Sequence, residues 1–154
     1  MKVIEYGWGE GFRVKVDAQR AGKRLAAIHK RKGHLSAELV VAEASKESSP
    51  LHEHFEWDNT EAAEQYRLVQ ARTILRAIVI IRDNGEKDTP LRAFVHLTDS
   101  EDEAVYMDIN VAMGDAAMRN QVLTRAWREL ESWRRRYEEY EELAAVFAAM
   151  DTAA

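Results

Sequence analysis

The first half of the chain alternates apolar and polar positions with the period of an α-helix. Residues 16–32 place apolar side chains at three- and four-residue spacing, which predicts one amphipathic helix ending at Gly33. Ser36 predicts the N-cap of a second helix, and Ser49 followed by Pro50 predicts the start of a short third helix. The apolar stripe of the first helix consists of Ala18, Ala21, Leu25 and Ile28.

A second helix start follows the third one almost at once, within the stretch "SSPLHEHFEWDNTEAAEQYR" at residues 48–67. Asp58 followed by Glu61 resembles a capping box, with Trp57 at a hydrophobic-staple position. We therefore expect a helix from about residue 59 into the mid-70s. Two helix starts back to back predict a corner of helix-turn-helix type, with three side chains turned inward: Leu51, Phe55 and Trp57.

The period then changes from 3.6 to 2, which is typical of β-strands. "AIVIIRD", "LRAFVHLT" and "EAVYMDINV" are rich in β-branched and aromatic residues, and "DNGEKDTP" between the first two has the residues of a hairpin loop. Alternation of apolar and polar side chains predicts a half-buried sheet of three antiparallel strands within residues 77–112.

The C-terminal region returns to helical spacing. Asp115 predicts the N-cap of a last helix reaching about Met150, roughly 50 Å long if unbroken. Its apolar positions keep three- and four-residue spacing for more than three heptads, as in coiled coils. We expect this stripe to hold a homo-oligomer, most simply a dimer, although a lone amphipathic helix commonly packs on its own sheet instead. The expected interface residues are Leu130, Trp133, Tyr137, Tyr140 and Phe147.

Together these elements predict an α+β fold in one domain over residues 1–154. It comprises a helical part at 12–76 that resembles a helix-turn-helix, the sheet at 77–112 and the long helix at 115–150. The helices and a hairpin acting as a wing would approximate a winged-helix module.

Composition narrows the class of protein. Of the 154 residues, 46% are hydrophobic and 32% are charged, which is typical of a soluble globular domain. The absence of cysteine excludes disulfides and thiolate metal sites and suits a reducing cytoplasm. No apolar run approaches the ~18 residues of a membrane span, and the N-terminus lacks the apolar core of a signal peptide. We therefore predict a cytoplasmic location and no membrane partner.

Charge is distributed in blocks. Residues 1–34 carry nine Lys/Arg and three Asp/Glu, whereas residues 35–66 carry one base and eight acids. The cations of the first helix lie opposite its apolar stripe and predict contacts with phosphates, although ordinary solubility explains them equally well. Reversing Arg24 and Arg31 should then weaken DNA binding without disturbing the fold. The candidate nucleic-acid-binding residues are Arg20, Lys23, Arg24, Lys30 and Arg31, with Arg67 on the helix after the corner.

The same sequence gives little sign of catalysis. His52 and His54 are two residues apart, and on a helical turn such side chains diverge, so we predict no metal site and no cofactor. Gly7, Gly9 and Gly11 are not followed by the Lys-Ser/Thr of a phosphate loop and read as an N-terminal lead. No catalytic constellation is recognisable, and we expect the protein not to be an enzyme.

The stretch from "SPLHEHFEWDNTEAAEQYRLVQARTILRA" through "RAFVHL" to "ELAAVFAAM" resembles a family of small uncharacterised phage and prophage proteins. The resemblance covers about residues 12–150 and implies a bacteriophage or mobile-element origin, hence the cytoplasm of a host bacterium. It implies no catalytic residues. The matching pattern consists of Ser49, Pro50, Leu51, His52, Phe55, Glu56, Trp57, Asp58, Ala62, Ala63, Tyr66 and Arg67.

These observations favour a small phage-encoded DNA-binding or DNA-associated regulator that works without catalysis. The alternative is a phage accessory protein that acts by protein–protein interaction. It would be an inhibitor of a host or defence protein, or a virion component. Its acidic block from Glu38 to Glu64 would then meet a basic partner or mimic DNA.

Overall fold

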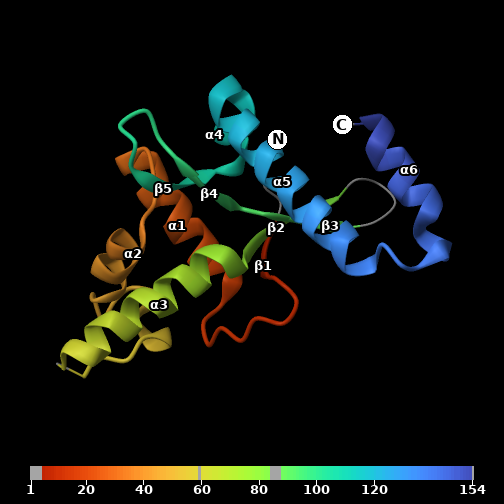
Figure 1. The fold of residues 1–154 in the computed structure, drawn as a ribbon. Coiled ribbons are helices and arrows are strands. Elements are labelled where there is room, and N and C mark those ends of the chain that lie inside the picture. The colour runs from red at the N-terminus through yellow and green to blue at the C-terminus, as the bar shows by residue number, and fades with distance from the viewer. Residues whose placement is uncertain (1–4, 59, 84–87, 154) are drawn as a thin grey trace.

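The structure is a computed structural model that describes residues 5–58, 60–83 and 88–153. Helices and antiparallel strands occupy separate parts of the chain, so the predicted α+β class is confirmed (Figure 1). Figure 1 shows the first three helices on one side, the last two helices on the other, and most of the strands between them.

The N-terminal helices follow the sequence closely. Helix α1 spans Ala18–Lys32 and ends at Gly33, whose φ of 80° is the left-handed conformation that favours glycine. Its N-cap is Asp17, which accepts a hydrogen bond from the Arg20 amide. Helix α2 spans Ala37–Ala44, and the predicted N-cap Ser36 accepts from the Leu39 amide.

The corner after α2 differs from the predicted one. The expected third helix is a single 3-10 turn, His52–His54, so no pair of α-helices forms a helix-turn-helix here. Helix α3 spans Glu61–Ala77, and its N-cap is Thr60 rather than Asp58. The Thr60 hydroxyl accepts from the Ala63 amide, while the backbone carbonyl of Asp58 accepts from Arg67. Because α3 begins two residues later than expected, the capping box expected from Asp58 does not form.

The strands form two sheets instead of one meander. Strand β1 (Glu5–Trp8) pairs with β2 (Ile78–Asp83), and β2 pairs with β3 (Asp88–Arg92). Strands β4 (Phe94–Thr98) and β5 (Ala104–Asp108) form a separate hairpin. The N-terminal lead is therefore part of the sheet. The Asn-Gly turn predicted between β2 and β3 lies outside the described residues.

One residue separates the two sheets. The predicted strand "LRAFVHLT" is interrupted at Ala93, whose amide donates to the Ile78 carbonyl and whose carbonyl accepts from the Ile109 amide. Ala93 is 1% exposed, so there is no room for a larger side chain where the chain turns from one sheet into the other.

Burial alternates along the β4–β5 hairpin, so its predicted half-buried character is confirmed. Phe94 faces the main apolar cluster beneath α1, α2 and α3, and Leu97 packs with Val105 and Met107 in a second, smaller cluster. On the face that carries Phe94, the side chains of His96, Thr98 and Ala104 are exposed. The predicted last strand ends early, since α4 (Ile109–Gly114) follows Asp108 directly and Val111 is exposed on this helix.

The long C-terminal helix is interrupted. Helix α5 spans Ala116–Tyr137 with Asp115 as its N-cap, as predicted, and α6 (Ala144–Ala153) follows a 3-10 turn at Glu141–Leu143. The break coincides with "EEYEE" at residues 138–142, four carboxylates at a helix C-terminus, where negative charge is unfavourable. Figure 1 shows α6 turning back beside α5.

Candidate nucleic-acid interface

Helix α1 presents most of its predicted cations to solvent. Its inner face is buried at Ala21, Leu25 and Ile28, which fixes the orientation of the whole helix. Four of the predicted residues on the outer face are exposed, and no ion pair involves them within the described part of the chain: Arg20, Lys23, Lys30 and Arg31. Spacings of three, seven and eleven residues align them on one side of the helix.

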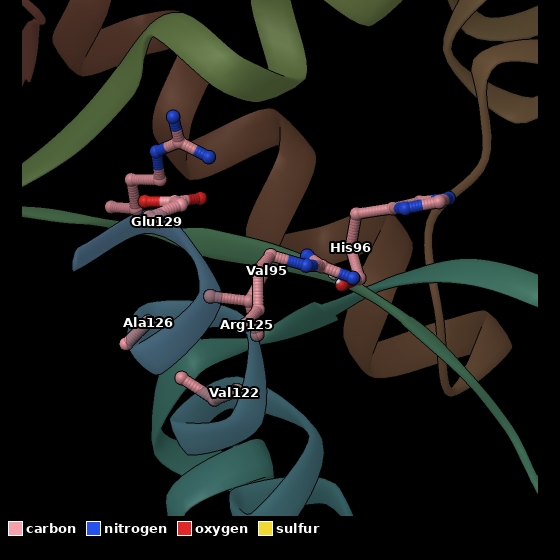
Figure 2. A pocket seen from close by; sticks show the side chains of 7 residues that line it. Val95, His96, Val122, Arg125, Ala126 and Glu129 are labelled. Atoms are coloured by element: carbon pink, nitrogen blue, oxygen red, sulfur yellow. Dashed lines mark hydrogen bonds between the residues drawn. The ribbon is translucent and has the colours of Figure 1, made fainter. Parts of the chain in front are cut away.

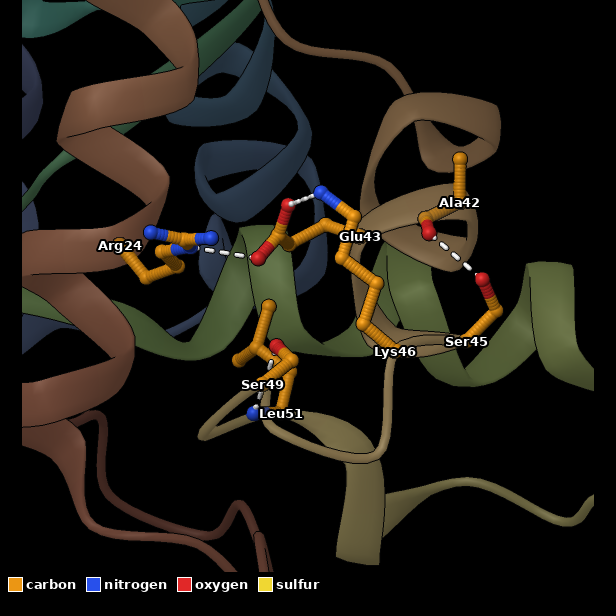
Figure 3. A network of polar contacts seen from close by, with 7 residues as sticks. All are labelled: Arg24, Ala42, Glu43, Ser45, Lys46, Ser49 and Leu51. Atoms are coloured by element: carbon orange, nitrogen blue, oxygen red, sulfur yellow. Dashed lines mark hydrogen bonds and ion pairs between the residues drawn. The ribbon is translucent and has the colours of Figure 1, made fainter.

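Arg24 belongs to a different arrangement. Its Nε donates to Glu43 of α2, and Lys46 Nζ donates to the other oxygen of the same carboxylate at 3.1 Å (Figure 3). Glu43 is only 3% exposed, so it depends on these two cations. Arg24 therefore joins α1 to α2. The expectation that its charge reversal leaves the fold intact is wrong, because a carboxylate there would face the buried Glu43.

Close packing against β1 holds α1 from behind. A side chain at Gly22 would place its Cβ 2.1 Å from Cγ of Tyr6, so only glycine fits beneath this ring. The Tyr6 amide donates to Gln19 Oε1 at 2.7 Å, a second link between β1 and α1. The outer cations therefore lie on a rigid scaffold.

The predicted site residue Arg67 lies inside the corner and not on its surface. It is 8% exposed, and its Nη1 donates to the carbonyls of Glu56 at 3.0 Å and Asp58 at 2.8 Å. Its guanidinium lies over the Trp57 ring, which also stacks on His52 at 5.0 Å. Arg67 thus holds the corner together and is not placed to contact a phosphate.

The two histidines of the corner serve different elements. His52 Nδ1 donates to the Ala44 carbonyl of α2 at 2.7 Å, whereas His54 Nδ1 accepts from the Lys15 amide before α1 at 3.3 Å. Among the residues that the structure describes, no cluster of three or more His, Asp or Glu side chains could hold a metal ion. The corner is a packed junction of α2, α3 and the β1–α1 loop.

The expected oligomer interface divides into a covered and an exposed part. Trp133 and Phe147 pack on each other at 5.8 Å, joining α5 to α6, and Arg134 of α5 pairs with Asp151 of α6. The other three predicted residues stay exposed: Leu130, Tyr137 and Tyr140. Helix α5 has no buried residue along its whole length, and two further exposed apolar side chains extend the stripe: Leu123 and Trp127.

A hollow that the sequence did not suggest lies between α5 and the β3–β4 segment. His96, Arg125, Glu129 and Arg92 line this hollow, whose volume is about 210 Å³. Figure 2 shows the lining side chains. Arg125 Nη1 donates to the His96 carbonyl and thereby ties α5 to β4. Burial and, secondly, the charge of Arg125 lower the pKa of His96. His96 and Arg125 are 29 positions apart, so no local motif could have revealed them.

Comparisons with protein-family models, with curated proteins and with solved structures find nothing that matches this chain. In the described residues no helix combines the length and the apolar character needed to cross a bilayer.

Proposed function

We propose that the protein is a small, non-enzymatic DNA-binding or DNA-associated regulator that contacts the phosphate backbone through the outer face of α1. The observation that carries the proposal is the exposure of Arg20, Lys23, Lys30 and Arg31 on one rigid face. Arg20 and Arg31 are eleven residues apart, which is about 16 Å along the helix. This length corresponds to roughly five base-pair steps of 3.4 Å along the axis of a DNA duplex.

The origin and location remain part of the proposal. The Ser-Pro-Leu-His and Phe-Glu-Trp-Asp pattern supports a phage or prophage protein acting in the cytoplasm of a bacterial host. The structure gives this pattern a physical reason, since Trp57 and Arg67 pack together at the corner. Such residues preserve a fold and say nothing of a DNA sequence, so backbone binding is the form of contact proposed.

A second copy of the chain is the proposed occupant of the exposed stripe on α5. Residues 116–128 carry three arginines and no acid, whereas residues 138–142 carry four glutamates. An antiparallel pair would set the acidic end of each copy beside the basic half of the other, and a parallel pair would set like charges together. Charge therefore favours an antiparallel dimer with the apolar stripe at its centre.

A second candidate function rests on the exposed acids of the corner. Glu53, Glu56, Asp58, Glu61 and Glu64 are all exposed, beside the packed group of His52, Trp57 and Arg67. A rigid acidic surface suits a basic protein partner, as expected of a phage accessory factor that binds a host protein.

Fluorescence anisotropy of a labelled mixed-sequence duplex across a salt series tests the first proposal. We compare Lys23→Glu/Arg31→Glu with Arg72→Glu/Arg76→Glu, a matched double reversal at exposed positions of α3. The α1 variant should weaken binding to every sequence and flatten the slope of log affinity against log salt, by roughly 0.9 per lost phosphate contact. The α3 variant should retain most of the DNA affinity and most of its salt dependence.

Two results would contradict this assignment. Equal losses in both variants would mean that only overall charge matters and that α1 is not the contact surface. No binding by the unmodified protein at low salt would end the DNA proposal and leave the acidic corner as the candidate.

A further inference from the structure

A hollow of about 240 Å³ lies on the far side of the corner from α2, between the β1–α1 loop, the 3-10 turn and α3. The loop runs beside α3 in Figure 1. The lining of the hollow contains two cations and no carboxylate, although the chain as a whole is acidic. The seven lining residues are Arg13, Lys15, His54, Tyr66, Val69, Gln70 and Thr73.

Besides the two cations, the hollow has a hydrogen-bond donor in the ring of His54. His54 is 7% exposed, and its Nδ1 accepts from the Lys15 amide. A neutral imidazole that accepts at Nδ1 carries its proton on Nε2. Within the described residues nothing accepts a hydrogen bond from this Nε2–H. A nearly buried donor without a partner, in a wall shared with Arg13 and Lys15, favours an anion.

The floor of the hollow is held in place by Gln70. Its Nε2 donates to the His54 carbonyl at 2.9 Å, and its Oε1 accepts from the Glu56 amide at 3.2 Å. These two bonds fix the 3-10 turn to the middle of α3. Binding an anion there would require little rearrangement of the backbone.

The rim of the hollow is apolar. Tyr66 and Val69 lie one turn apart on α3 and are 54% and 51% exposed, the largest exposed apolar side chains of that helix. The exposed ring of Tyr66 lies near the cations Arg13 and Lys15. This combination suits a ligand in which a planar ring is attached to an anionic group.

We propose that this hollow binds a phosphate ester that carries an aromatic ring, as a nucleotide does. The phosphate forms ion pairs with Arg13 and Lys15 and accepts a hydrogen bond from Nε2–H of His54. The base of the nucleotide stacks on the ring of Tyr66. The ligand is either a free nucleotide or the phosphorylated end of a nucleic-acid strand. The site is separate from the outer face of α1 and stands or falls independently of it.

The test follows the ring-proton NMR signals of His54 and Tyr66 in the full-length protein during titration with AMP, inorganic phosphate and adenosine at millimolar concentration. AMP should shift both sets of signals, and phosphate and adenosine should each bind more weakly. A 5′-phosphorylated oligothymidylate distinguishes the two sources: tighter binding than AMP assigns the site to a strand end. No shift with AMP, or equal affinity for phosphate and AMP, would overturn the proposal.

Variants separate the parts of the site. His54→Asn keeps an acceptor for the Lys15 amide but is too short to place a donor where Nε2 lies, and Arg13→Gln/Lys15→Gln removes both charges. Each should weaken AMP binding about tenfold or more. Tyr66→Phe should retain binding, whereas Tyr66→Ala should lower the affinity for AMP to that for phosphate. Arg135→Gln/Arg136→Gln, a matched charge change on α5, should bind AMP normally; if it loses binding equally, charge alone is responsible and the site is wrong.

Discussion

Helices α1 and α5 carry comparable apolar stripes yet end in opposite situations. Helix α1 has fifteen residues and buries Ala21, Leu25 and Ile28 in the main core. Helix α5 has twenty-two residues and buries none, with Trp127 and Leu130 left open to solvent. Amphipathic spacing therefore indicates that a helix packs against an apolar surface, but not whether this surface belongs to the same chain. Helix α1 packs against the core of its own chain, whereas for α5 we propose a second copy of the chain.

The largest contrast should appear when one leucine is removed from each region. Leu25→Ala empties a fully buried site on α1 and should cost about 2–5 kcal/mol of unfolding free energy, whereas Leu130→Ala on α5 should cost about 0.5 kcal/mol in the monomer. Urea unfolding at a concentration where the protein is monomeric measures both. Equal losses of unfolding free energy would mean that Leu130 on α5 is as tightly packed as a leucine in the main core.

Trp57 lies between these extremes. The sequence alone predicts a loss of about 3–5 kcal/mol for Trp57→Ala if the ring is fully buried. The ring is instead half-buried between contacts with His52 and Arg67, so we expect about 2–3 kcal/mol. Thermal melts of Trp57→Ala and Trp57→Phe decide it, and an unchanged melting temperature in the alanine variant would assign the ring to binding rather than to stability.

Arg24 tests whether α1 is fixed by charge as well as by apolar packing. Arg24→Ala leaves Glu43 with Lys46 alone and should cost about 1–2 kcal/mol near neutral pH. Burial raises the pKa of Glu43, but the hydrogen bonds and charges of Arg24 and Lys46 outweigh it and hold that pKa below its ordinary value. The stabilisation is therefore fully present above the ordinary pKa of a glutamate and is lost as the pH falls through the lowered pKa.

Denaturation across a pH series from neutral to acid measures this dependence. The Arg24→Ala variant should lose less stability on acidification than the unmodified protein, because less of its stability depends on an ionised Glu43. Glu43→Gln is the control: in its presence, Arg24→Ala should have little further effect on the unfolding free energy. An equal loss from Arg24→Ala with and without Glu43→Gln would show that Arg24 does not act through this carboxylate.

Charge reversals along α5 and just after it should have the smallest effect on folding and the clearest effect on dimer formation. Arg119→Glu/Arg128→Glu and Glu138→Lys/Glu141→Lys each place like charges together in an antiparallel pair. Alone, each variant should scatter light as a 17.7 kDa monomer, and an equimolar mixture should recover the dimer. Monomeric behaviour of the unmodified protein at tens of micromolar, or a mixture that stays monomeric, would contradict the antiparallel pairing.

Local signals predicted much of the fold. Ser36, Asp115 and Gly33 end or begin helices through contacts within four residues, and all three act as expected. The interruption at Ala93 was missed because it depends on backbone partners at Ile78 and Ile109, which spacing cannot reveal.

Sites were harder to predict than elements. Four of the five cations expected on α1 are exposed, because a helical wheel suffices to place them. Arg24 and Arg67 were misplaced because their partners come from other elements: Glu43 lies nineteen residues from Arg24. The bond between Lys15 and His54 spans thirty-nine residues, so the hollow beside it has no signature in the sequence.

Gly22 also limits how this protein can evolve. A glycine inside a helix is destabilising by roughly 1 kcal/mol relative to alanine, and here the Tyr6 ring excludes every other residue. In a deep mutational scan we expect position 22 to tolerate nothing else while Tyr6 is present, although Lys23 beside it accepts many replacements without unfolding. The two neighbours would then drift at very different rates, so selection on the outer face of α1 could retune its charge while the strand behind it stays fixed.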